Sequence, residues 1–251
     1  MINTINLWDC LEIMKKIPDG SIDAIITDPP YGTTACKWDS VIPFDLMWAE
    51  LKRIIKPNGA IVLFGSEPFS SVLRMSNIKE YKYDWIWEKT IVWWFVNAKN
   101  KPLNTFEKIH IFSDWTCANW SDNKMCYFPQ WLIEINKIRD WRRSCNDEHR
   151  LKRKSHKENH LQQFTNYPKN ILKFWSQWNT VHPTQKPVAL LEYLIKTYTN
   201  EWETVLDFTA GSGTTWVACQ NTNRNYILIE KDSDYCEIIK KRLASTTPPL
   251  L

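Results

Sequence analysis

Apolar residues recur along the chain in two patterns, as short continuous runs and as runs with helical spacing, and the two alternate. Short runs at residues 4–7, 24–27, 60–64, 83–87 and 108–112 predict strands, and spaced apolar residues at 10–17 and 44–55 predict helices. Near the end of the chain, helices are predicted at 188–198, 214–220 and 235–243, and strands at 204–208 and 226–230. Strands that alternate with helices are typical of an α/β fold with a mostly parallel sheet covered on both faces.

Length and composition fit one main core. A chain of 251 residues with 43% hydrophobic residues can bury one substantial core, with room for a smaller inserted subdomain. No apolar run reaches the roughly 18 residues of a membrane span, and the first ten residues lack the layout of a signal peptide. The seven cysteines are scattered without a C-x-x-C pair, so we expect a cytoplasmic protein with neither disulfides nor a metal site.

The regular pattern fades from residue 113 to 178, where polar, aromatic and basic residues dominate. Residues 139–160 carry eight Lys and Arg against four Asp and Glu, an excess equal to the net charge of +4 of the whole chain. A local basic excess favours a surface that faces phosphates, and a solvated charged helix or loop is the simpler alternative. The candidate phosphate-binding residues are Arg139, Arg142, Arg143, Arg150, Lys152, Arg153 and Lys154.

A glycine turn joins the predicted strand at 204–208 to the predicted helix at 214–220. Gly211 and Gly213 let the backbone pass close under a ligand, and the start of the helix offers free N–H groups. Glu230 ends the next predicted strand, about 20 residues further on, where a carboxylate can accept both hydroxyls of a ribose. A G-x-G turn alone is a weak signal that also fits an ordinary turn, but together with Glu230 it favours a nucleoside site.

The second motif, Asp28-Pro29-Pro30-Tyr31, directly follows the strand predicted at 24–27. The amine of a nucleobase is a weak nucleophile, and a pair of acceptors that bind its hydrogens favours the pyramidal form that attacks a sulfonium methyl group. Asp28 can accept one N–H and the Pro29 carbonyl another, because the Pro-Pro step fixes that carbonyl in an extended geometry. Tyr31 can stack on the base. Placement and hydrogen bonding suffice for such a reaction, although the motif alone also fits a structural turn.

Taken together, these motifs resemble those of a known family. D-P-P-Y at 28–31, the basic region, H-P-T-Q-K-P at 182–187, F-T-A-G-S-G at 208–213 and I-E-K-D at 229–232 follow the order of the β class of DNA amino-methyltransferases. The resemblance implies a Rossmann-like, S-adenosylmethionine-dependent methyltransferase fold with permuted motifs, in which the strand before Gly211 lies beside the strand before Asp28. It implies a catalytic part at 1–112, a target-recognition insert at 113–178, a cofactor-binding part at 179–245 and a tail at 246–251.

The resemblance also assigns cofactor contacts. Phe208, Gly211 and Gly213 would line S-adenosylmethionine, with Asp207 and Thr214 beside them, and Glu230 would hold its ribose. Asp9 and Cys10 would reach its adenine, and Thr184 and Lys186 its methionine end. The catalytic residues would be Asp28, Pro29, Pro30 and Tyr31.

The implied activity is site-specific methylation of adenine N6 in duplex DNA. A base inside a duplex is out of reach, so it must be flipped into the pocket. The acidic first residue of the motif favours adenine, because relatives that act on cytosine N4 usually carry Ser there. Cytosine N4 or RNA methylation and a DNA-binding protein that has lost its cofactor remain alternatives. A homodimer and a cognate restriction endonuclease are open as partners, and the recognition sequence cannot be read from the insert.

Tryptophan and glycine occur in unusual numbers, 15 and 6, where average usage predicts roughly 17 glycines. Trp8, Trp202 and Trp216 occupy a strand end, a turn and the helix after Gly213, which are places where the resemblance leads us to expect glycine or another small residue. Our hypothesis is that some of these letters are UGA codons that the source genome reads as Gly. A protein that uses many tryptophans to stack on bases is the alternative, and UGG codons at Trp8, Trp202 and Trp216 would contradict the decoding hypothesis.

Overall fold

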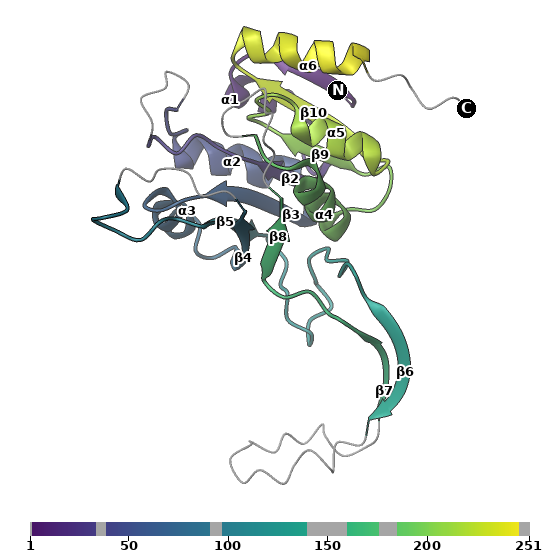
Figure 1. Cartoon of the computed structure of the whole chain (residues 1–251). Coiled ribbons are helices and arrows are strands. Elements are labelled where there is room, and N and C mark those ends of the chain that lie inside the picture. The colour runs from purple at the N-terminus through teal and green to yellow at the C-terminus, as the bar shows by residue number, and fades with distance from the viewer. Residues whose placement is uncertain (1, 34–38, 91–96, 140–159, 176–184, 246–251) are drawn as a thin grey trace. The chain divides into compact units, whose positions relative to one another are not determined.

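An eight-stranded sheet is the centre of the molecule (Figure 1). It belongs to a computed structural model that describes residues 2–33, 39–90, 97–139, 160–175 and 185–245. The strand order is β1-β10-β9-β2-β3-β5-β4-β8, and β5 is the only one of these strands that runs antiparallel to its neighbours. The predicted α/β fold with a mostly parallel sheet is therefore confirmed. The strands are β1 (Thr4–Leu7), β10 (Asn225–Glu230), β9 (Thr204–Asp207), β2 (Ile22–Thr27), β3 (Ile55–Gly65), β5 (Phe106–Phe112), β4 (Tyr81–Lys89) and β8 (Ile171–Phe174).

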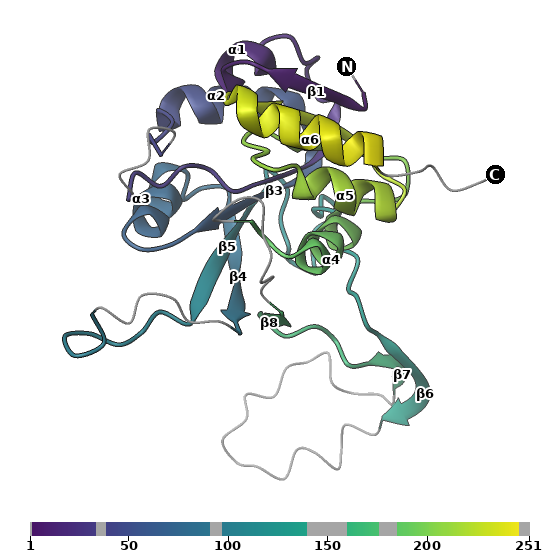
Figure 2. The same ribbon diagram turned by 45° about the horizontal axis from the view of Figure 1, so that its top comes forward.

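Helices cover both faces of the sheet (Figures 1 and 2). One group comprises α1 (Cys10–Met14), α2 (Phe44–Ile54) and α3 (Phe69–Ser76), and the other α4 (Val188–Tyr198), α5 (Thr214–Asn221) and α6 (Ser233–Ser245). Successive residues of a strand point to opposite faces. In β2, Ala24 and Ile26 therefore pack into the core that contains α4, whereas Ile25 packs into the core that contains α1 and α2. The buried strands read as continuous apolar runs for this reason.

The order of the central strands brings the two sequence motifs to one edge. β9 pairs in parallel with β2, with Ile25 opposite Leu206. The chain that follows β9 proceeds outward to β10, and the chain that follows β2 proceeds outward to β3 on the other side. Such a switch point opens a crevice at the carboxyl ends of the strands. The expectation that the strand before Gly211 lies beside the strand before Asp28 is confirmed.

The antiparallel strand β5 reaches the same edge with its first residues. Lys108 of β5 lies opposite Gly65, the last residue of β3. Glu107 therefore lies just beyond the carboxyl end of β3. Glu107, the second residue of the antiparallel strand, is in this way placed beside loops that follow parallel strands.

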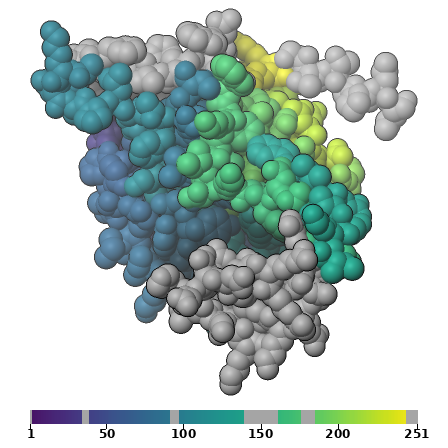
Figure 3. Space-filling model, turned by 60° about the horizontal axis from the view of Figure 1, so that its bottom comes forward, coloured from purple at the N-terminus to yellow at the C-terminus, as the bar shows by residue number. Residues whose placement is uncertain are grey.

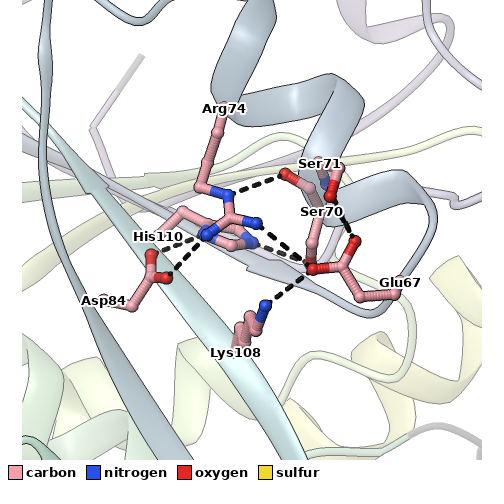
Figure 4. Close-up of polar contacts among 7 residues, drawn as sticks. All are labelled: Glu67, Ser70, Ser71, Arg74, Asp84, Lys108 and His110. Carbon is pink, nitrogen blue, oxygen red and sulfur yellow. Dashed lines mark hydrogen bonds and ion pairs between the residues drawn. The ribbon is translucent and has the colours of Figure 1, made fainter.

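A polar cluster joins α3 to strands β4 and β5 (Figure 4). His110 is fully buried, and its Nδ1 lies 2.6 Å from Asp84 Oδ1 while its Nε2 lies 2.8 Å from Ser70 Oγ. Gly65 lies against this pair, since a Cβ there would come within 2.7 Å of Ser70 Oγ. Both ring nitrogens have partners, so the buried histidine carries no unsatisfied polar group. Ion pairs among Glu67, Arg74, Asp84 and Lys108 surround it.

Several elements differ from the sequence prediction. The helix expected to reach residue 55 ends at Ile54, and β3 begins at Ile55 because that residue pairs with Ile22. The region expected to lack regular structure contains three strands, and one of them, β8, pairs with β4 of the central sheet. Figure 3 shows the surface near this pair, with the blue residues that include β4 next to the green residues that include β8. In the described parts of the chain no helix is long and apolar enough to cross a membrane.

The chain contains two compact units, Met1–Phe128 with Asn170–Leu251, and Pro129–Lys169. The second unit contains a two-stranded antiparallel sheet of β6 (Ile133–Arg139) and β7 (His160–Thr165). The basic candidates from Arg142 to Lys154 lie between these strands, outside the described residues. This unit falls within the predicted insert, and the boundaries 113 and 178 stay predictions.

Candidate active site

A cavity of about 480 Å³ opens at the carboxyl edge of the sheet, beside the switch point between β9 and β2. Its volume lies in the range of sites for small molecules and cofactors, roughly 300–1,000 Å³. The cavity brings together both predicted motifs, because the loops that follow β2 and β9 line it. The predicted site residues among its lining are Asp9, Cys10, Asp28, Pro29, Pro30, Tyr31, Lys186, Asp207, Phe208, Gly211, Thr214 and Glu230.

The loop after β2 holds Asp28 and Tyr31 together. Tyr31 donates its hydroxyl to Asp28 Oδ1 at 2.5 Å, and its ring stacks on Phe69 of α3 with centroids 4.9 Å apart. Thr209, from the loop after β9, donates its hydroxyl to the Asp28 carbonyl at 3.0 Å. Burial, with the nearby carboxylates of Asp28 and Glu107, raises the pKa of Tyr31 well above 10, so its hydroxyl keeps its proton. The loop is therefore fixed from three sides before any ligand binds.

Two lysines and two carboxylates form a cluster of charges beside the loop that follows β2. Lys186 Nζ lies 2.7 Å from Asp28 Oδ2 and 2.7 Å from Glu107 Oε1, and Lys89 Nζ lies 2.8 Å from Glu107 Oε2. Desolvation opposes a buried charge, but a close opposite charge favours it. Burial would raise the pKa of Glu107, yet Lys186 and Lys89 hold it to about 2. The two carboxylates raise the pKa of Lys186 despite its burial, so it is a cation.

Asp28 itself is balanced between opposing effects. Burial raises its pKa, Lys186 lowers it, and the charge of Glu107 raises it again, with a net rise above the ordinary value. A raised pKa in a cleft with a specific charged partner is typical of a functional group. Asp28 is thus an acceptor whose charge depends on its immediate neighbours.

Asp207 ties the two central strands together at the switch point. Its carboxylate accepts hydrogen bonds from the hydroxyls of Thr27 and Thr215, and from the backbone N–H of Thr209 at 3.2 Å. Burial raises its pKa to about 6, although these hydrogen bonds oppose the rise. One side chain therefore joins β9 to the end of β2 and to the first turn of α5.

The glycine turn after β9 has the backbone that its sequence predicts. Gly211 and Gly213 have φ of +52° and +79°. A Cβ on Gly213 would come within 2.9 Å of Ile239, so this glycine lets α6 pack closely, and it is not among the cavity-lining residues. Gly211 donates its N–H to Glu230 Oε2 at 2.7 Å, and Asp232 donates its N–H to Oε1 at 2.8 Å. Glu230 is held in a fixed orientation at the cavity edge.

The chain after β1 closes the far side of the cavity. Asp9 caps α1, because its side chain accepts the Leu11 N–H at 3.0 Å, and Lys231 approaches its other oxygen at 3.4 Å. Cys10 is partly buried, and burial raises the pKa of its thiol to about 11. Phe208 is buried against the core below. Together they give this end of the cavity an apolar floor and a polar rim.

Some predicted residues are not placed in the cavity. Thr184 lies outside the described residues, and Arg139 belongs to β6 in the second unit. Glu107, Lys89 and Thr27 form part of the polar network around the motifs, and the sequence reasoning missed them. The available signal for Glu107 was its spacing of two residues from Ile109 and of four from Ile111, which puts an acidic residue on the buried face of β5.

The cavity fits a nucleoside cofactor by the chemistry of its donors and acceptors. It offers a fixed carboxylate at Glu230, an apolar floor at Phe208 and a glycine turn that leads into α5. Glycine turns at the start of a helix after a strand are typical of nucleotide sites. Among the described residues, no group of three or more His, Cys, Asp or Glu could hold a metal ion.

The sequence is similar to curated methyltransferases over nearly its whole length. It is 28% identical to the type II methyltransferase M.HinfI of Haemophilus influenzae, with 98% of this chain and 70% of that protein covered. It is 27% identical to the type II methyltransferase M2.MboI of Moraxella bovis, with 96% of this chain and 88% of that protein covered.

Solved structures share the fold. The crystal structure of the M1.HpyAVI–SAM complex matches with a TM-score of 0.60 and 26% identity, covering 95% of this chain and 100% of that one. The PvuII DNA methyltransferase, cytosine-N4-specific, matches with a TM-score of 0.66 at 16% identity, which shows the fold alone, covering 100% of this chain and 89% of that one. The prediction that this chain has the Rossmann-like fold of S-adenosylmethionine-dependent DNA methyltransferases is confirmed. The DNA methylase family, N6_N4_Mtase, matches residues 22–241, and the chain belongs to this family.

Proposed function

We propose that this enzyme is a site-specific DNA methyltransferase that transfers a methyl group from S-adenosylmethionine to N6 of adenine in duplex DNA. One observation carries the proposal. Asp28 and Tyr31 line the same cavity as Glu230 and the turn at Gly211, so an amine site adjoins a nucleoside site. The type II methyltransferases among the relatives and the SAM-bound M1.HpyAVI structure support the reaction and the cofactor.

The chain's own residues prepare the amine. When bound, S-adenosylmethionine supplies a methyl group that its sulfonium already activates. Asp28 accepts one N–H of the adenine amine, and the Pro29 carbonyl accepts the other. Transfer would form the nitrogen–carbon bond, break the sulfur–methyl bond to leave a neutral thioether, and release one proton of the amine, which the Asp28 carboxylate would receive. Once the amine is bound, acceptors that are already oriented in a partly dry site lower the barrier to methyl transfer.

The cofactor would lie between the loop after β9 and the chain after β1. Glu230 would hold the ribose, Phe208 and Gly211 would contact the nucleoside, and Asp9 with Cys10 would reach the adenine. Lys186 was expected at the methionine end, and its ion pair with Asp28 supports a position between the two substrates. Thr184 and Thr214 complete the proposed contacts.

The DNA would bind with the target adenine flipped out of the duplex, since the acceptors lie inside a cavity. Tyr31 would stack on the flipped base, and the basic residues of the insert would contact phosphates. We place the enzyme in the cytoplasm, with a homodimer and a cognate restriction endonuclease as further predicted associations. The acidic Asp28 favours adenine over cytosine N4.

Transfer of labelled methyl groups to unmethylated genomic DNA tests this function. The wild-type protein should label the DNA, and Asp28→Ala should reduce the rate by at least about 100-fold, as expected for the loss of a group that acts in the transition state. Asp19→Ala is a matched control, because Asp19 is an exposed aspartate paired with Arg53 outside the cavity. Full activity of the Asp28→Ala protein would contradict the mechanism.

A further inference from the structure

Glu107 is a buried carboxylate that the proposed reaction does not use. It is 4% exposed and is the second residue of β5, the antiparallel strand that reaches the active-site edge. Its carboxylate oxygens lie 2.7 Å from Lys186 Nζ and 2.8 Å from Lys89 Nζ, and they accept a hydrogen bond from the Tyr31 hydroxyl at 2.9 Å. Buried charges are costly unless they are paired and hydrogen-bonded, so a carboxylate with three such donors has a defined place in the site.

Two of these donors are also the partners of Asp28. The Tyr31 hydroxyl bridges Asp28 Oδ1 and Glu107 Oε1, and the Lys186 ammonium bridges Asp28 Oδ2 and Glu107 Oε1. Among the described residues, both donors to the Asp28 carboxylate are thus shared with Glu107. An amine that binds Asp28 has to compete with these two donors. A donor displaced from a buried acceptor costs free energy unless another acceptor is already in place.

We propose that Glu107 is a positioning residue for methyl transfer, which takes over the Tyr31 hydroxyl and the Lys186 ammonium when Asp28 turns to the target amine. The proposal rests on the proposed function, because it concerns the same site. It does not require Glu107 to touch the substrate. Without this carboxylate, Lys186 would pair with Asp28 alone and hold it more tightly.

The charges that face Asp28 fix the direction of a pH test. Lys186 and the Tyr31 hydroxyl favour the ionised form of Asp28, Glu107 disfavours it, and Asp207 lies close enough for Asp28 to raise its pKa. Thr209 contacts the Asp28 carbonyl and carries no charge. Because Asp28 must be ionised to accept the amine, activity falls as pH drops through its pKa. This fall in activity is the acid limb of the pH profile. Removal of the Glu107 charge should therefore move the acid limb to lower pH.

Glu107→Gln is the decisive variant, because it keeps the shape and removes the charge. We expect kcat to fall by about 10- to 100-fold, as for the loss of a hydrogen bond to a charged group. KM for S-adenosylmethionine should stay within about twofold, and the acid limb of kcat should move to lower pH. Glu88→Gln is the matched control on the adjacent strand, since its half-buried carboxylate pairs with exposed Lys173 outside the cavity. It should leave kcat and the pH profile unchanged.

Tyr31→Phe gives a second test of opposite sign. It keeps the ring on Phe69 and removes the hydroxyl that favours ionised Asp28, so the acid limb should move to higher pH. A carbon-13 NMR titration of the Asp28 carboxyl in the free proteins gives the same comparison without activity, and Asp28 should titrate at lower pH in Glu107→Gln than in wild type. If wild type methylates no DNA, the proposed function fails while this titration still tests Glu107. An unchanged Asp28 titration, or a normal kcat in folded Glu107→Gln, would overturn the positioning role.

Discussion

Trp202 has a backbone conformation that glycine adopts far more readily. Its φ is +67° in the turn before β9, and its side chain is 70% exposed. Trp131 has φ of +61°. A bulky residue with positive φ is a genuine outlier, because its Cβ crowds the neighbouring backbone. These two positions support the hypothesis that some Trp letters stand where the natural protein has glycine.

Trp202→Gly should therefore raise the free energy of unfolding by about 1 kcal/mol, the cost of a left-handed conformation for an L-residue. Trp120→Gly is the control, because Trp120 is 87% exposed and is not among the described residues with positive φ. Its replacement should give no stabilisation. Urea denaturation of both variants measures the difference, and equal effects would argue against strain at Trp202.

Trp216 behaves differently from the sequence expectation. A small residue was expected at this position, but the Trp216 side chain is 3% exposed in a small core with Ala210, Leu228 and Ile239. The indole of Trp216 therefore lies in the interior, between α5 and α6. Trp8, by contrast, is 62% exposed at the cavity rim.

Helix α3 is an element that the sequence did not predict. Its residues FSSVLRMS include three serines, which favour caps and turns over helix interiors, and it is only eight residues long. It persists because Ser70 bonds buried His110 and because Phe69 stacks on Tyr31. Both interactions connect residues far apart in the sequence, so local patterns could not indicate them.

Adjacent serines in α3 allow a matched test of this anchor (Figure 4). Ser70→Ala should lower the free energy of unfolding by about 1–3 kcal/mol, because it leaves a ring nitrogen of buried His110 without its partner. Ser71→Ala removes an exposed hydroxyl that bonds Glu67 and should change stability by less than about 0.5 kcal/mol. Chemical denaturation compares the two, and a similar loss in both would mean that the buried histidine does not anchor α3.

The buried Asp207 carboxyl that joins β9 to β2 makes the free energy of unfolding depend on pH. The pKa of Asp207 rises from an ordinary 3.8 to about 6 in the folded protein, so folding favours its protonated form. Its stabilising contribution is complete below about pH 4 and is lost as pH rises toward 6 and above. Asp207→Asn cannot ionise, so the stability difference, variant minus wild type, should increase between about pH 4 and pH 7. Thermal unfolding across this range measures it, and a flat difference would contradict a raised pKa.

At the scale of the whole molecule, the sequence predicted the switch point well. The strands before Asp28 and Gly211 were expected side by side, and their pairing depends on continuous apolar runs that only a doubly covered sheet can bury. Glu107 and β8 could not be predicted, because each joins the sheet through a partner that is distant in sequence. In the region from 113 to 178, few apolar residues alternate regularly, so the hydrophobic pattern did not predict the three strands found there.

Single-molecule sequencing of DNA from cells that express either wild type or Asp28→Ala tests the central claim most directly, because it reports the modified base and its sequence context together. The account predicts N6-methyladenine in one recurring context with wild type and none above background with Asp28→Ala. N4-methylcytosine with wild type, or equal adenine methylation by the variant, would contradict it.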